Sequence, residues 1–235
     1  MERVRAAYDA VEAAFERAGH GPKWPVSLVI ERMPIMGATQ SRVNGGHLIH
    51  VSLQAAASEM VAGLIAHEMG HIARTEARHP SHNKVVHDRA LARVRVPRSF
   101  GRGFPRLARS AIGHVEDIYA DDYAIPLTIG ERSRDFFAEW VRNAIARTGD
   151  RWEEVFGALD IAFSLGNLER HGLIGGTDPL RAGARDFAAA RGIRSLEALT
   201  TLYRDLPDPV TDEACEDILA GLLRTTLDEL RSRPA

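Results

Sequence analysis

The stretch from Ser58 to Ile72 reads SEMVAGLIAHEMGHI. Its larger apolar residues recur at intervals of mostly three and four, which is typical of an amphipathic helix, and Ser58 is a suitable N-cap for it. Residues four apart lie on the same face of a helix, so His67 and His71 can direct their imidazole nitrogens toward one cation. The stretch therefore predicts both a helix and a metal site.

Zinc is the cation that this histidine spacing favours. Neutral imidazole is a zinc ligand, and a catalytic zinc site takes three protein ligands and leaves a fourth position for water. Glu68 lies beside both histidines, where it can accept a proton from the metal-activated water as a general base. Gly70 and Ala66 leave room for another element to approach this helix closely. The hypothesis is a Zn²⁺ site that includes His67, His71 and the catalytic Glu68.

Short strands are predicted before the motif helix. Val26–Met33 is rich in branched apolar residues, and His47–Leu53 alternates in polarity after Asn44-Gly45-Gly46, a strong turn signal. We expect two or three strands here, with His47–Leu53 at the sheet edge, where it could align an extended substrate. Residues 4–15 read as an amphipathic helix ended by Gly19–Pro22.

The rest of the chain reads as helical. Residues 79–104 are polar and interrupted by Pro and Gly, which predicts one short helix and loops. Leu107–Ile125 has one apolar side and predicts a longer helix, and five further helices are expected near residues 131–148, 151–171, 179–191, 195–205 and 211–231. The sequence therefore predicts an α+β fold, in which a small twisted sheet packs on the motif helix and on an acidic helix alongside it. Residues 1–130 would form this catalytic unit, and residues 131–235 an all-helical extension packed on it.

These features resemble the gluzincins, zinc metallopeptidases whose third metal ligand is an acidic residue on a later helix. The resemblance, to a soluble, minigluzincin-like core, covers about residues 24–126 and includes Asp117-Ile118-Tyr119-Ala120-Asp121. Family members carry there an acidic residue, two bulky residues, alanine and a second acidic residue. The register implies Asp117 as third ligand and Asp121 as the residue that orients a histidine. Because the family usually has Glu at the first position, Glu116, about 100° away on the helix, stays the alternative ligand.

The activity that the resemblance implies is hydrolysis of peptide bonds in a peptide or protein substrate. A catalytically silent zinc-binding regulatory or scaffold protein is one alternative, and the intact Glu68 counts against it. Another is a nucleic-acid-associated protease of the Spartan type, with Arg89–Arg109 as the contact surface and His82 as third ligand. His79 and His87 are further candidate ligands. The oxyanion-stabilising group could come from Tyr119, Tyr123, His114 or His87.

Composition narrows the partners and the compartment. With 30 basic and 32 acidic residues, the net charge of −2 offers no global field to attract nucleic acid or an anionic membrane. Cys215 is the single cysteine, which excludes an intrachain disulfide and a multi-cysteine zinc site. No apolar run is long enough for a signal peptide or a membrane span, so we expect a cytoplasmic protein.

Overall fold

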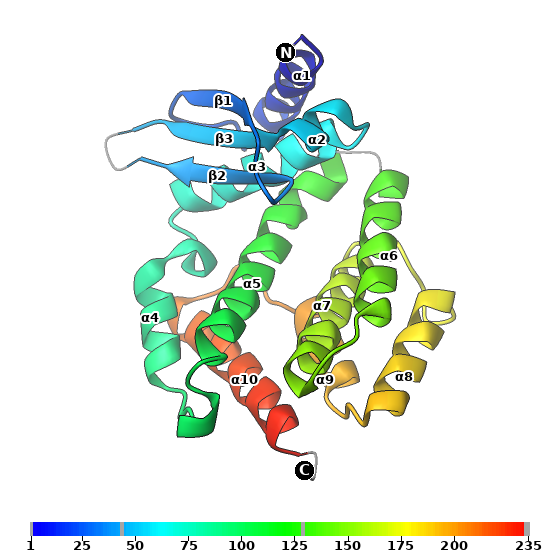
Figure 1. Ribbon diagram of the computed structural model, residues 1–235. Coiled ribbons are helices and arrows are strands. Elements are labelled where there is room, and N and C mark those ends of the chain that lie inside the picture. Colours follow the sequence, from blue (N-terminus) through cyan, green and yellow to red (C-terminus); the bar gives the residue numbers. More distant parts are fainter. Residues whose placement is uncertain (1, 43–44, 128–129, 233–235) are drawn as a thin grey trace. The chain divides into compact units, whose positions relative to one another are not determined.

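The computed structural model describes residues 2–42, 45–127 and 130–232 (Figure 1). The chain has the predicted α+β fold, with a small three-stranded sheet near the N-terminus and helices after it. It divides into two compact units, each made of two stretches of sequence. The first unit comprises Met1–Asn83 and Glu116–Ser133, and the second comprises Lys84–Val115 and Arg134–Ala235. Residues 84–115, which were predicted to belong to the catalytic unit, therefore cluster with the C-terminal helices.

The sheet of the first unit contains β1 (Val26–Glu31), β2 (Gly37–Ser41) and β3 (His47–Ser52) in the order β1-β3-β2. β3 pairs in parallel with β1 and antiparallel with β2. The prediction that His47–Leu53 forms an edge strand is therefore wrong, because β3 is central. Its second neighbour, β2, reads GATQS, and such small and polar residues give no strand signal even though their backbone pairs regularly with β3.

The turn before β3 contains glycines in the left-handed region, with φ of 92° at Gly45 and 99° at Gly46. These values are accessible to glycine without steric cost, which explains the turn signal. Asn44 of the predicted turn lies outside the described residues.

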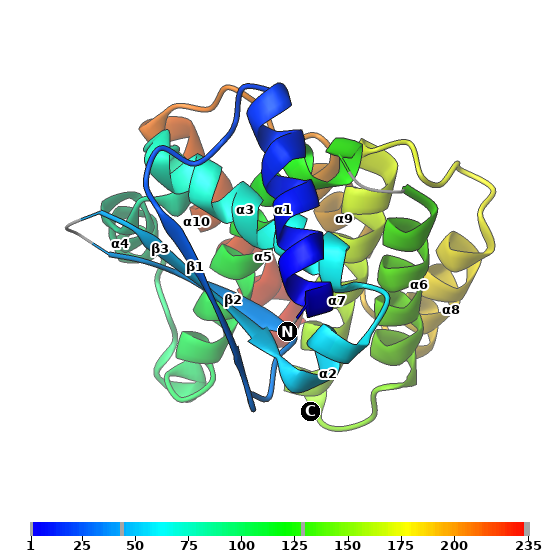
Figure 2. The ribbon, with the colours of Figure 1, turned by 90° about the horizontal axis from the view of Figure 1, so that it is seen from above.

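Two helices complete the core of the first unit. Figure 2 shows α1 (Glu2–Arg17) lying across α3 (Val61–Glu76), the motif helix, next to the three strands. Buried apolar side chains from all three elements meet there, among them Phe15, Ile49 and Ile65. This packing holds the motif helix against the sheet.

A short helix, α2 (Leu53–Ala57), precedes the motif helix and was not predicted. Ser52 caps α2, because its side chain accepts a hydrogen bond from the Ala55 amide. Ser58, the predicted N-cap of the motif helix, instead ends α2, and Met60 occupies the N-cap position of α3. The predicted helix therefore begins later than its sequence signal suggests.

The second unit is helical. It contains α4 (Lys84–Ala92), α5 (Phe104–Leu127) up to Val115, and α6 (Gly130–Ala146) from Arg134 onward, followed by four further helices, α7 (Arg151–Arg170), α8 (Pro179–Arg191), α9 (Leu196–Arg204) and α10 (Asp212–Arg231). The sequence predicted the last five helices close to these bounds. α7 is central, since every residue from Val155 to Leu168 is buried. In the described part of the chain, no helix combines the length and apolarity needed to cross a bilayer.

Candidate metal centre

The site is built where the motif helix α3 meets the C-terminal half of α5, within the first unit. A Cβ atom on Gly70 would lie 2.3 Å from the Ala120 carbonyl oxygen, a separation that no side chain tolerates. Glycine at this position therefore lets the two helix backbones touch. The buried Arg74 also links them, because its Nε donates a hydrogen bond of 2.8 Å to the Tyr119 carbonyl.

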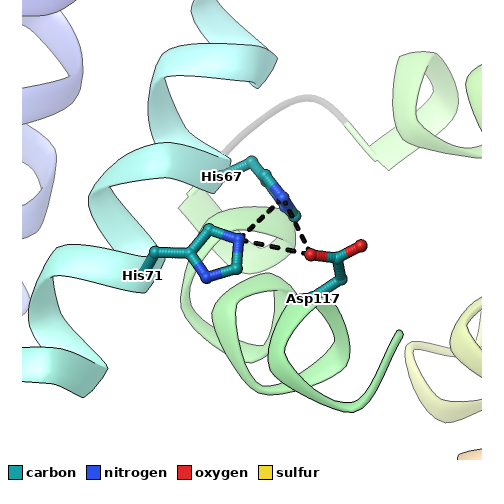
Figure 3. A group of neighbouring side chains, drawn as sticks. All are labelled: His67, His71 and Asp117. Atoms are coloured by element: carbon teal, nitrogen blue, oxygen red, sulfur yellow. Dashed lines mark hydrogen bonds and ion pairs between the residues drawn. The ribbon is translucent and has the colours of Figure 1, made fainter. Parts of the chain in front are cut away.

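This helix contact brings together His67 and His71 from α3 and Asp117 from α5 (Figure 3). The two Nε2 atoms are 3.1 Å apart, and Asp117 Oδ1 lies 3.6 Å from that of His67 and 3.3 Å from that of His71. All three side chains are partly exposed, between 19% and 27%. The three atoms therefore face one point that solvent can reach.

The other nitrogen of each imidazole has its own partner. His67 Nδ1 lies 2.7 Å from Asp121 Oδ1, and His71 Nδ1 lies 2.8 Å from His82 Nε2. A carboxylate only accepts hydrogen bonds, so His67 Nδ1 carries a proton, and in the neutral form of His67 the Nε2 atom has a lone pair that faces Asp117. In that form, two electron-donating atoms, His67 Nε2 and Asp117 Oδ1, face each other without a hydrogen between them.

The pKa shifts of the side chains at the site favour positive charge on His67 and negative charge on Asp117. Burial lowers the pKa of His67, but the carboxylates of Asp121 and Asp117 outweigh it and raise that pKa well above its ordinary value. Burial raises the pKa of Asp117, but its contacts with His67 and His71 hold it well below its usual range. Burial and the neighbouring His71 lower the pKa of His82 well below its ordinary value, which favours its neutral form.

Zinc fits this donor set. Nitrogen and oxygen ligands about 2.0–2.1 Å from a tetrahedral zinc ion lie about 3.3–3.4 Å from one another, and the three separations in the structure are 3.1, 3.3 and 3.6 Å. Two imidazoles and one carboxylate are also ligand types that catalytic zinc takes. The spacing and the types of these residues are therefore compatible with a bound zinc ion.

Glu68 lies against the sheet and is not one of this group of three. Its Oε2 accepts a hydrogen bond of 2.6 Å from the Thr39 hydroxyl on β2, and its backbone carbonyl accepts a weaker one of 3.2 Å from the same group. The residue is 4% exposed. Thr39 could not be predicted as a partner of Glu68, because nothing in the sequence signals that β2 lies over the motif helix.

Other candidate ligands lie elsewhere. Among the described residues, the one group of three metal-ligating side chains is His67, His71 and Asp117, so Glu116 is not part of it. Burial, and then the adjacent Asp117, raise the pKa of Glu116 to about 8. His82 contacts the outer nitrogen of His71, and His79 lies behind it against Ser81. His87 belongs to α4 of the second unit.

The candidate oxyanion-stabilising residues have other contacts. Tyr119 is buried with its ring centroid 4.5 Å from that of His79, and the ring of Tyr123 is 4.1 Å from His20. His114 is buried in the second unit, where its Nε2 lies 3.3 Å from an Asp160 carboxylate oxygen. The sequence offered no signal for these contacts, which join residues distant along the chain.

A model of a protein family matches residues 6–226, which include the site and most of both units. That family is described as a family of unknown function. No curated protein matches the chain, and neither does any solved structure. Because the match covers most of its length, the chain belongs to the family of unknown function DUF5781.

Proposed function

We propose that this chain is a zinc-dependent peptidase of the gluzincin type. One observation carries the proposal: His67 Nε2, His71 Nε2 and Asp117 Oδ1 converge within 3.1–3.6 Å of one another, beside a glutamate on the same helix. That spacing and the ligand types match what a catalytic zinc ion requires. The partial exposure of the three side chains lets water reach them.

Each residue has a defined role in the proposal. His67, His71 and Asp117 would hold zinc, which when bound lowers the pKa of a coordinated water and polarises a carbonyl group. Glu68 would accept the proton of the attacking water and later deliver it to the departing amine. The Thr39 hydroxyl holds one oxygen of that carboxylate. Asp121 orients the His67 ring through Nδ1.

The position of Glu68 supports a peptide as substrate. Its carboxylate lies against β2, and β2 is an edge of the sheet in the described chain. An extended peptide can pair with an edge strand through backbone hydrogen bonds, which aligns it regardless of side chains. Substrate alignment is thus assigned to β2 in place of the central strand β3.

Metal content tests the first half of the proposal. Purified wild type should contain one zinc per chain by mass spectrometry, and His67→Ala and His71→Ala should each lose it. His50→Ala, which changes a histidine of β3 outside the group of three, should retain zinc. Wild type that binds no zinc, or full occupancy in the double variant of His67 and His71, would sink the proposal.

Glu68→Gln tests the chemistry. An amide cannot accept the proton, so the variant should retain zinc and fold yet hydrolyse casein or a mixed peptide library about 100-fold to 10,000-fold more slowly. Chelator-treated wild type is the control for background cleavage. Zinc-loaded wild type that cleaves nothing would indicate a latent or narrowly specific enzyme, or the zinc-binding regulatory or scaffold protein; if Glu68→Gln cleaves at the wild-type rate, Glu68 is not the base.

The cytoplasm is the proposed compartment. Cys215 is a buried cysteine that cannot form an intrachain disulfide, as is usual for proteins of reducing compartments. A fluorescent fusion to either end of the chain, followed by cell fractionation, would test this assignment.

A further inference from the structure

Behind His71, on the side away from Asp117, a series of hydrogen-bonding groups runs through the turn that follows the motif helix. His71 Nδ1 lies 2.8 Å from His82 Nε2, His82 Nδ1 lies 2.8 Å from Ser81 Oγ, and Ser81 Oγ lies 2.7 Å from His79 Nδ1. Ser81 is fully buried and His79 is 8% exposed, so water does not compete for the contact between these two residues.

The direction of every bond in this series follows from one backbone amide. The Ser81 N–H can only donate, and it donates to His79 Nδ1 over 3.3 Å. His79 Nδ1 is therefore an acceptor, so the Ser81 hydroxyl also donates to it. The hydroxyl oxygen then accepts from His82 Nδ1–H, which leaves His82 Nε2 as an acceptor.

The last link reaches the metal site. His82 Nε2 accepts a hydrogen bond from His71, so His71 Nδ1 must carry a proton. In a neutral His71 the other ring nitrogen, Nε2, is then unprotonated. That nitrogen is the atom that faces His67 and Asp117. The amide of Ser81 thus selects the His71 tautomer that can bind a metal.

The backbone holds this series in place. Arg78 has a left-handed φ of 54°, a conformation that is costly for a residue with a side chain. This conformation ends α3 and turns the chain back, with the His79 amide donating to the Arg74 carbonyl over 2.9 Å. The short helix η1 (Pro80–His82) then packs against α3.

We propose that His82, together with Ser81 and His79, positions His71 and sets its tautomer for metal binding. The inference rests on the proposed function and extends that function. It assigns a neutral partner, His82, to His71, whereas the partner of His67 is the carboxylate of Asp121. His82 is a positioning residue in this scheme, not a metal ligand. Its loss weakens metal binding without removing a ligand.

The test is zinc affinity, measured by competition with a chromophoric chelator. His82→Leu removes the acceptor and should weaken zinc binding about 10-fold to 100-fold, the range seen for such outer partners. His82→Gln places an amide oxygen near the position of Nε2 and should restore most of the affinity. Ser81→Ala breaks the series with little change in volume, so it decides the question if His82→Leu does not fold. His50→Leu is the matched control.

The tautomer of His71 is the second readout. Imidazole ¹⁵N shifts of the zinc-loaded protein should show a proton on His71 Nδ1 in wild type, and its signal should shift or broaden in His82→Leu. Zinc bound by wild type and all variants with equal affinity would overturn this inference alone. A wild type that binds no zinc would overturn the proposed function as well.

Discussion

At the scale of single residues, the choice between two adjacent carboxylates decides the composition of the site. Asp117 contacts both histidines, whereas Glu116 is a partly buried neighbour whose pKa is raised to about 8 by burial. One step along a helix turns a side chain by about 100°, so the two cannot exchange roles without rotation of α5.

Substitution of these carboxylates should therefore have unequal effects. Asp117→Ala removes a ligand and should weaken zinc binding by more than about 100-fold, beyond the range for outer partners. Glu116→Ala, the matched neighbour, removes no ligand. It should change zinc affinity by less than about threefold, a smaller factor than the roughly tenfold that one pKa unit represents. Both are measured by chelator competition. Zinc loss in Glu116→Ala alone would mean that α5 has the other register in solution.

At the scale of secondary-structure elements, the approach of α3 to α5 positions the third ligand. Gly70→Ala would place a methyl group 2.3 Å from the Ala120 carbonyl oxygen, a backbone atom that cannot swing away. The helices would separate, so we expect a loss of about 1–3 kcal/mol in the free energy of unfolding. Zinc affinity should fall with it, because Asp117 moves with α5. Denaturant unfolding and chelator competition measure the two effects.

Gly63 on the same helix provides the control. A Cβ atom there meets nothing within 4 Å. Gly63→Ala should therefore stabilise the protein by up to about 1 kcal/mol, through helix propensity alone, and leave zinc affinity unchanged. Equal stability of the Gly70 and Gly63 variants would show that the helices do not touch in solution.

At the scale of the whole molecule, charge distinguishes the peptidase from a nucleic-acid-associated protease. Arg89–Arg109 contains seven arginines and no acidic residue, within a chain of net charge −2. Three of the seven form ion pairs with acidic residues of the second unit, namely Arg89, Arg93 and Arg106. We infer that the remaining positive charge of this segment is too small for it to bind nucleic acid at physiological salt.

Fluorescence anisotropy with a short DNA duplex and a single strand tests this inference. In about 150 mM salt we expect dissociation constants above about 10⁻⁴ M, the weak limit of non-specific binding. Tighter binding that falls with salt would favour the nucleic-acid alternative. It should then disappear when the other four arginines, which are exposed, are changed to glutamate: Arg95, Arg98, Arg102 and Arg109.

The sequence alone determined the features that depend on local periodicity. Three- and four-residue spacing predicted the motif helix and the C-terminal helices, and the four-residue step predicted that His67 and His71 share a face. The α+β class followed from the order of these patterns. β2 escaped prediction because GATQS has no periodic signal, and its pairing with β3 depends on backbone groups that every residue carries.

Only the tertiary structure decided which distant residues meet. Gly70 reads as a helix glycine, and its contact with Ala120 exists because two helices cross. Thr39 gave no sequence signal, and His82 was expected only as an alternative metal ligand, since their partners Glu68 and His71 lie on another element or across a turn. Whether Asp117 or Glu116 faces the two histidines likewise depends on the orientation of α5 about its axis, which packing determines and local sequence does not.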